Sequence, residues 1–170
     1  LSSEYAGTQG SAVVKLFEMT VAVTGINERT AKAKGIAYDK TYTYSASHAG
    51  YYPGARNLSV KVLWERDTLR LLGAQIVGFE GVDKRMDVLA TAIRLGAKVT
   101  DLKELELVYA PPFSSAKDPV NMAGYVAENV VTGKLKQFFW DEVDDLPRDG
   151  SVTLLDVRTP AEVAAGRIAG

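Results

Sequence analysis

The chain has 170 residues, 46% of them hydrophobic and 24% charged, and its 20 basic and 21 acidic side chains leave a net charge of −1. This composition is typical of a globular protein, and the balanced charge argues against nucleic-acid binding, which needs an excess of Lys and Arg. With no cysteine and one histidine, the chain has no disulfide and no thiolate nucleophile, and we expect no metal site.

We expect neither a membrane span nor a signal peptide. No apolar run reaches the roughly 18 residues that a membrane span requires, and residues 1–10 are polar and contain glycine. We therefore expect a cytoplasmic protein with no membrane partner. Because the chain begins with Leu1 rather than Met and ends directly after a helical pattern, we also expect a piece of a longer polypeptide.

The first part of the chain predicts strands and one short helix. Residues 11–17 and 19–24 are rich in Val, Phe and Thr and predict one bent strand or two short ones. Asn27 is a favourable N-cap for a helix over residues 28–34. Residues 38–45 predict a strand with its tyrosines on one face and its threonines on the other.

A hairpin and a helix follow. Residues 58–64 alternate apolar and polar side chains, and residues 69–79 are apolar on both faces, which predicts a central strand of an antiparallel sheet. From Val82 the apolar period becomes helical, and Gly96 stands at the expected end of the helix. A helix after a hairpin indicates an α+β fold in which helices pack on the sheet.

The next segment predicts a turn, a rigid loop and a second helix. Residues 101–107 predict a short helical turn, and residues 109–119 contain three prolines and form a fixed loop. Asp118 as N-cap and Pro119 at the first helical position begin a helix that ends near Thr132. Its apolar residues spread wider than one stripe, so we expect cover from two sides, one of them a partner subunit.

The C-terminal segment predicts the start of another domain. Residues 134–150 mix charges with an aromatic cluster and indicate a partly docked linker, residues 152–157 predict a short strand, and a helix opens over residues 160–165. The expected domains are therefore residues 1–133, a linker over 134–150, and an incomplete domain over 151–170.

Motifs for nucleotide binding and hydrolysis are missing. Gly73 and Gly78 are spaced as in a P-loop, but Phe79 occupies the position of the required lysine, and there is no G-x-G-x-x-G or G-x-S-x-G sequence. The candidate functional sites are instead two loops, residues 47–54 and 109–115, because each places tyrosine close to proline. They predict either a pair of phenolic hydrogen-bond donors or simple aromatic packing on the sheet.

Six motifs, in one order, resemble the C-terminal dimerisation domain of the FAD-dependent pyridine nucleotide-disulfide oxidoreductases. The resemblance is strongest to the branch of coenzyme A-disulfide reductase, NADH oxidase and persulfide reductase, and it covers about three quarters of the chain. The motifs are GTQG at 7–10, VTGINE at 23–28, SHAGYYPG at 47–54, LGAQ at 72–75, GVDKR at 81–85 and YAPPFSSAKDPVN at 109–121.

This resemblance implies a homodimer whose interface domain reaches over the flavin site of the partner subunit. NAD(P)H would reduce FAD, the flavin would reduce a cysteine–sulfur bond, and coenzyme A or sulfide would leave. The domains that bind FAD and NAD(P)H, and the reactive cysteine, are absent from this sequence, so the isolated chain is expected to be inactive. An NADH oxidase of the same family and a noncatalytic α+β binding module are the alternatives.

The same resemblance implies roles for residues of the two loops. Tyr51 and Tyr109 would be phenols near the partner's cysteine, which donate hydrogen bonds at neutral pH. The substrate, a coenzyme A derivative, would contact these tyrosines and also Tyr52 and His48. The flavin pocket would be walled by Pro111, Pro112 and Phe113.

The last twenty residues resemble the start of an α/β rhodanese domain, through LLDVR at 154–158, Pro160, Glu162 and GRI at 166–168. The order of the two resemblances along the chain favours the fused type, a reductase followed by a rhodanese domain. A sulfurtransferase activity of the chain itself is a further alternative, which the missing cysteine opposes.

Overall fold

The computed structural model describes residues 4–5 and 7–167. The chain divides into two compact units, residues 1–135 and residues 136–170. The first unit carries the sheet, its covering helices and both tyrosine-bearing loops.

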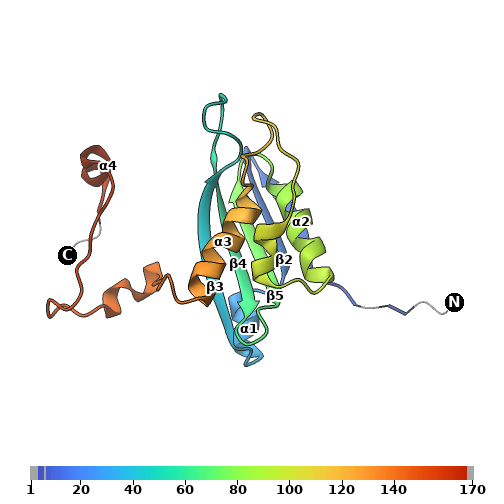
Figure 1. Ribbon diagram of the computed structural model, residues 1–170, viewed down its shortest axis with the longest axis horizontal. Helices are drawn as coiled ribbons and strands as arrows, with labels where there is room; N and C mark the ends of the chain where they lie inside the picture. The colour runs from blue at the N-terminus through green and yellow to red at the C-terminus, as the bar shows by residue number, and fades with distance from the viewer. Residues whose placement is uncertain (1–3, 6, 168–170) are drawn as a thin grey trace. The chain divides into compact units, whose positions relative to one another are not determined.

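The first unit is built on a five-stranded antiparallel sheet with the order β1-β2-β5-β4-β3 (Figure 1). Residues 11–24 form two strands, because Phe17 adopts a left-handed conformation (φ 55°) that turns the chain between them. β5 pairs with β2 on one side and β4 on the other, which confirms its predicted central place. The strands are β1 (Ala12–Leu16), β2 (Met19–Gly25), β3 (Tyr38–Ala46), β4 (Asn57–Glu65) and β5 (Leu71–Gly78).

Helices α2 (Val82–Arg94) and α3 (Pro119–Val131) cover one face of the sheet (Figure 1). The core lies between these layers and includes the whole predicted apolar set of β4, which is Leu58, Val60, Val62 and Trp64, all at most 2% exposed. Burying each such side chain stabilises the fold by about 1.5–3 kcal/mol. The α+β fold with helices packed on an antiparallel sheet is therefore confirmed.

The predicted faces of β3 are also observed, with the threonines toward the helices. Thr41 and Thr43 are buried on the helix-covered face, whereas Tyr44 lies exposed on the opposite face. The tyrosines of this strand are therefore not core residues. Alternation in the sequence separates the two faces but does not tell which one the helices cover.

Helix α3 is covered from two sides within its own unit. One side packs on the sheet, and the other packs on η1, a 3-10 helix over Val99–Glu104 that begins two residues before the predicted turn. Gly124 allows the close approach, because a Cβ there would lie 2.6 Å from the backbone nitrogen of Lys103. Part of the cover expected for this helix thus comes from the same chain.

The short helix α1 (Glu28–Ala33) lies at the end of the sheet opposite the tyrosine-bearing loops (Figure 1). Asn27 caps it as predicted, since its side chain accepts a hydrogen bond from the backbone nitrogen of Thr30 at 2.9 Å. Glu28, in the first turn, binds Tyr38, Lys40 and Lys61 of the neighbouring strands. This ion cluster fastens the helix to the sheet.

The second unit contains η2 (Trp140–Asp145) and the helix α4 (Pro160–Ala165), where a helix was predicted. The strand predicted over residues 152–157 is wrong: this segment is irregular and exposed. A strand is stable only when its backbone pairs with a neighbour, and the described part of this unit contains no other strand. Ile168, part of the predicted rhodanese resemblance, lies outside the described residues.

Among residues 4–5 and 7–167, no helix is long and apolar enough to cross a membrane.

Candidate functional site

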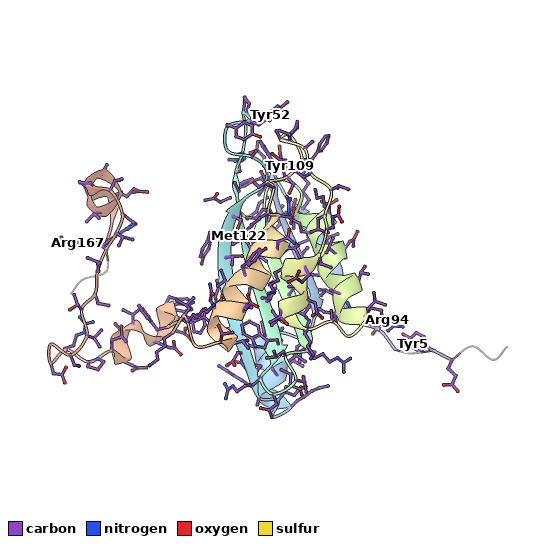
Figure 2. All side chains as sticks on the ribbon, in the orientation of Figure 1. Tyr5, Tyr52, Arg94, Tyr109, Met122 and Arg167 are labelled. Carbon is purple, nitrogen blue, oxygen red and sulfur yellow. The ribbon has the colours of Figure 1, made fainter. Side chains whose placement is uncertain are left out.

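Two tyrosines that are 58 positions apart in the sequence meet at one end of the first unit. The hydroxyl oxygens of Tyr51 and Tyr109 lie 3.1 Å apart and share a hydrogen bond. Tyr51 belongs to the first tyrosine loop, residues 47–56, and Tyr109 to the second tyrosine loop, residues 109–118. Figure 2 shows the neighbouring labelled tyrosines, Tyr52 and Tyr109, at this end of the unit.

The first tyrosine loop connects β3 with β4 and is closed at its base. The backbone nitrogen of Ser47 donates to the carbonyl of Arg56 at 2.9 Å, which continues the pairing of the two strands. A turn follows, in which the nitrogen of Tyr52 donates to the carbonyl of Ala49 at 2.9 Å. Gly54 has φ 91°, a conformation that other residues rarely adopt. The turn lifts Tyr51 into solvent.

The second tyrosine loop is a proline turn that leans on the first. Pro111 and Pro112 occupy the centre of a turn closed by a 2.9 Å hydrogen bond from the nitrogen of Phe113 to the carbonyl of Ala110. The backbone nitrogen of Ala49 in the first loop lies 3.0 Å from the carbonyl of Ser114 and 3.3 Å from that of Pro111. Backbone hydrogen bonds therefore join the two loops below their tyrosines.

The two phenols differ in exposure, and their contact changes the acidity of one. Tyr51 is 77% exposed and Tyr109 48% exposed. The hydrogen bond with Tyr51 raises the pKa of Tyr109 above its ordinary value of 10.0. Tyr109 therefore stays protonated at neutral pH and can donate a hydrogen bond or a proton to a ligand that reaches the pair.

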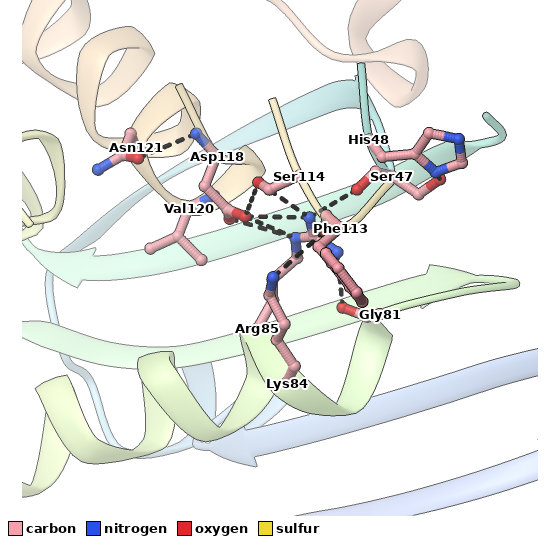
Figure 3. Close-up of polar contacts among 10 residues, drawn as sticks. All are labelled: Ser47, His48, Gly81, Lys84, Arg85, Phe113, Ser114, Asp118, Val120 and Asn121. Carbon is pink, nitrogen blue, oxygen red and sulfur yellow. Dashed lines mark hydrogen bonds and ion pairs between the residues drawn. The ribbon is translucent and has the colours of Figure 1, made fainter. Parts of the chain in front are cut away.

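A buried arginine lies beneath the two loops (Figure 3). Arg85 of α2 is 1% exposed. Its guanidinium donates to the carbonyl of Ser47 at 2.7 Å, to the carbonyl of Gly81 at 3.0 Å and to both carboxylate oxygens of Asp118. It thus connects the start of the first loop, the start of α2 and the end of the second loop. We call Arg85, Asp118 and Ser114 with these two carbonyls the Arg85 cluster.

Asp118 completes the Arg85 cluster and begins α3. Its carboxylate accepts a 2.6 Å hydrogen bond from the hydroxyl of Ser114 and a 3.0 Å bond from the nitrogen of Val120, as expected of an N-cap. Its own nitrogen donates to the side chain of Asn121, and the amide of Asn121 donates to two carbonyls, of Leu102 and Leu105. One network thus links the loops to α3 and to the segment that contains η1.

The other residues predicted for the site take different positions around the phenols. His48 is buried, and its ring nitrogens bond within its own loop, to the hydroxyl of Ser47 at 3.2 Å and to the carbonyl of Pro53 at 3.3 Å. Tyr52 stacks edge-on against His48, with ring centroids 5.7 Å apart. Pro112 and Phe113 are exposed at the tip of the second loop, and Pro111 is half-buried.

Sequence reasoning about the site did not include Arg85 and Ser114, and it treated Asp118 only as an N-cap. One signal was present: Arg85 interrupts the apolar face of α2, between the buried residues Val82 and Leu89. A charged residue on a core-facing stripe needs a partner, because burying an unpaired charge is costly. The partner, 33 residues further along, could not be identified from spacing.

Within residues 4–5 and 7–167, no group of three or more His, Asp or Glu side chains could hold a metal ion. Phe113 and Pro112 present exposed apolar surface on the loop that also carries Tyr109.

The sequence has recognisable relatives. Residues 11–119 match the family described as pyridine nucleotide-disulphide oxidoreductase, dimerisation domain. A coenzyme A disulfide reductase of Staphylococcus epidermidis is 42% identical over 127 residues, which are 75% of this chain and 28% of that protein. The chain therefore spans less than a third of the length of this curated relative.

Solved structures resemble the chain in the same way. The crystal structure of reduced Bacillus anthracis CoADR-RHD is 49% identical and covers 99% of this chain and 30% of its own, with a TM-score of 0.94. A NAD-dependent persulfide reductase from A. fulgidus is 39% identical and covers 81% of this chain and 25% of its own, with a TM-score of 0.78.

Proposed function

The chain belongs to the pyridine nucleotide-disulphide oxidoreductases through their dimerisation domain, and we propose that it is the C-terminal interface domain of an FAD-dependent NAD(P)H oxidoreductase. The proposed substrate of the parent enzyme is coenzyme A disulfide or a coenzyme A persulfide. The domain would form a homodimer and complete the active site of the partner subunit. The expected location is the cytoplasm, where NAD(P)H is available.

The observation that carries this proposal is the contact between Tyr51 and Tyr109. Two exposed phenols, held 3.1 Å apart by two loops that share backbone hydrogen bonds, form a donor pair directed away from their own core. Such a pair suits a ligand that arrives from another subunit. The substrates named for the 42% identical S. epidermidis protein and for the A. fulgidus structure are a disulfide and a persulfide, and both release a sulfur anion when reduced.

The phenols would stabilise that sulfur anion. A protonated Tyr109 can donate a hydrogen bond to the leaving thiolate, while Tyr51 orients Tyr109 through their shared bond. Because the hydrogen bond with Tyr51 raises the pKa of Tyr109, proton transfer from Tyr109 to a thiolate is less favourable than from an ordinary phenol, which favours hydrogen bonding. The proposed role is therefore electrostatic and positional, with Tyr52 contacting the substrate and His48 supporting the loop.

FAD would be held mainly by domains outside this chain, and when bound it supplies electron transfer from NAD(P)H to the sulfur bond. The side chains here that fit it are Pro111, Pro112 and Phe113, which present apolar surface at the tip of the second tyrosine loop. They would exclude water from the reacting sulfur.

The tail is proposed to begin a rhodanese domain. The match to the B. anthracis structure covers 99% of the chain and so includes residues of the second unit. Thr159 and Glu162 cap α4 reciprocally, with the nitrogen of Thr159 donating to Glu162 at 2.8 Å, so the helix start is encoded locally. The chain has no cysteine, and we expect it to transfer no sulfur from thiosulfate by itself.

The experiment follows the visible flavin band of the purified full-length protein while NADH and then coenzyme A disulfide are added. We expect the band to bleach with NADH and to return with the disulfide. A protein that binds no flavin after FAD is supplied, or whose reduced flavin ignores the disulfide, would contradict the proposal.

The tyrosines are tested by turnover of the variant that carries both Tyr51→Phe and Tyr109→Phe. We expect a loss of about 100-fold or more, the usual effect of removing a positioned hydrogen-bond donor that stabilises a developing anion. Tyr44→Phe is the matched control, because Tyr44 is also exposed, at 69%, but lies on the face of the sheet opposite the helices. If the double variant and the control turned over equally fast, Tyr51 and Tyr109 would be packing residues without a role in the reaction.

A further inference from the structure

The tyrosine pair has little support of its own. Tyr51 is 77% exposed and Tyr109 48% exposed, and both belong to loops outside the sheet and the helices. Exposed loops are mobile unless other contacts restrain them. The 3.1 Å separation of the two hydroxyls therefore depends on what fixes the bases of the loops.

The Arg85 cluster joins these bases. The guanidinium of Arg85 donates to the carbonyl of Ser47, the first residue of the first tyrosine loop. The same group binds Asp118, the last residue of the second tyrosine loop, and lies 3.4 Å from the hydroxyl of Ser114 within that loop. One planar group thus contacts both loops, and Figure 3 shows it between them.

The geometry requires arginine rather than any cation. The donors of the guanidinium are fixed in one plane, and here they address four groups: two carbonyls, a hydroxyl and a carboxylate. A lysine would keep the charge, but its single ammonium could not span these acceptors. The cluster is also buried, with Arg85, Ser114 and Asp118 at most 2% exposed, so water cannot substitute for a lost bond without rearrangement.

We propose that Arg85 and Asp118 are positioning residues that set the separation of Tyr51 and Tyr109, although neither touches the substrate. The pair holds the two tyrosine loops in register from below. This role deepens the proposed function, on which its catalytic importance rests.

The test uses the ionisation of Tyr109 as a reporter of the pair. In the 170-residue chain labelled with 13C at the tyrosine Cζ position, NMR titration follows each phenol separately. Tyr51→Phe removes the partner and lowers the pKa of Tyr109 toward its ordinary value, which defines the signal of a broken pair. We expect Arg85→Lys to reproduce a large part of that fall while the core remains folded.

The matched control is Arg66→Lys. Arg66 also binds an aspartate, Asp39, with its Nε and Nη2 atoms, but the two side chains are 59% and 36% exposed and Arg66 lies in the turn between β4 and β5. We expect this control to leave Tyr109 unchanged. An unchanged Tyr109 in folded Arg85→Lys would overturn the proposal.

Ser114→Ala serves if Arg85→Lys does not fold. It removes only the hydroxyl that joins the second tyrosine loop to Asp118, and we expect a smaller fall in the pKa of Tyr109. No change in that variant would refute the positioning role.

Turnover of the full-length enzyme separates this inference from the proposed function. We expect Arg85→Lys to lower kcat by about 10-fold or more, since small misplacements of reacting groups are costly, and to leave the KM for NADH unchanged. A fall in the pKa of Tyr109 without loss of turnover would support the positioning role and contradict the catalytic use of the tyrosines. No fall in the pKa would contradict the positioning role whatever the turnover.

Discussion

Replacing Glu28 with glutamine should destabilise the first unit, and the loss should depend on pH. Burial alone would raise the pKa of this carboxyl, but hydrogen bonds from Lys40, Lys61 and Tyr38 outweigh it and lower the pKa from 4.5 to about 2. Glutamine keeps the shape of the side chain and removes the charge that these donors recognise.

The expected loss of stability follows from the lowered pKa of Glu28. Its fall from 4.5 to about 2 corresponds to about 3.4 kcal/mol at ~1.36 kcal/mol per pH unit. Because the side chain is 19% exposed, we expect a smaller loss, about 2–3 kcal/mol at neutral pH. The contact also raises the pKa of Lys61 against the effect of burial, but it is the same interaction and is counted once.

The stability that Glu28 contributes depends on pH as expected for a carboxyl whose pKa is lowered by folding. Its contribution is complete above the unfolded value of about 4.5 and declines as the pH falls toward about 2. The wild-type chain should therefore exceed Glu28→Gln in stability most at pH 7, and by less than half as much near ~pH 3.

Urea unfolding followed by the fluorescence of Trp64 measures this difference. Trp64 is fully buried in the first unit, and a Trp140→Phe background removes the other tryptophan, which is 83% exposed. Glu18→Gln is the control, since Glu18 is 86% exposed and lies 3.7 Å from its partner Arg56, and we expect less than about 0.5 kcal/mol. A Glu28→Gln variant as stable as wild type at pH 7, or a difference that does not shrink in acid, would refute the reasoning.

Three further predictions concern the fold. Arg85→Met leaves the buried carboxylate of Asp118 without its charged partner and should lower the free energy of unfolding in urea by about 3–5 kcal/mol. Adding Asp118→Asn should restore part of this loss. If the effects of the two changes were fully additive, the two residues would not interact. Gly124→Ala places a Cβ 2.6 Å from the nitrogen of Lys103. Despite the better helix propensity of alanine, it should lower Tm and reduce the free energy of unfolding by about 1–3 kcal/mol. A raised Tm would mean that η1 can move away freely. In hydrogen exchange, the amides of residues 152–157, which are irregular and exposed, should exchange far faster than those of β5, and strong protection there would show that the segment is paired after all.

Local periodicity accounts for most of the correctly predicted fold. The apolar alternation of Leu58 to Trp64, the cap at Asn27 and the start of α3 at Pro119 each depend on neighbours a few residues away, and the structure has all three. The same local logic failed for residues 152–157, because a short apolar run becomes a strand only when another strand is available to pair with it.

The candidate site was predictable only in part. Tyrosine beside proline marked both loops, and the structure brings Tyr51 and Tyr109 into contact. The Arg85 cluster depends on contacts across 29, 33 and 38 residues, and no spacing rule pairs such distant residues. The catalytic use of the tyrosines stays a prediction.

Mixed dimers of the proposed full-length reductase test the central claim most directly. One subunit carries Tyr51→Phe and Tyr109→Phe, and the other carries both tyrosines but has its flavin-site cysteine replaced by serine. If the tyrosines of one subunit complete the site of the other, each mixed dimer has one intact site and should reduce coenzyme A disulfide at about half the wild-type rate, while both parent homodimers are nearly inactive. Mixed dimers as inactive as those homodimers would contradict the claim.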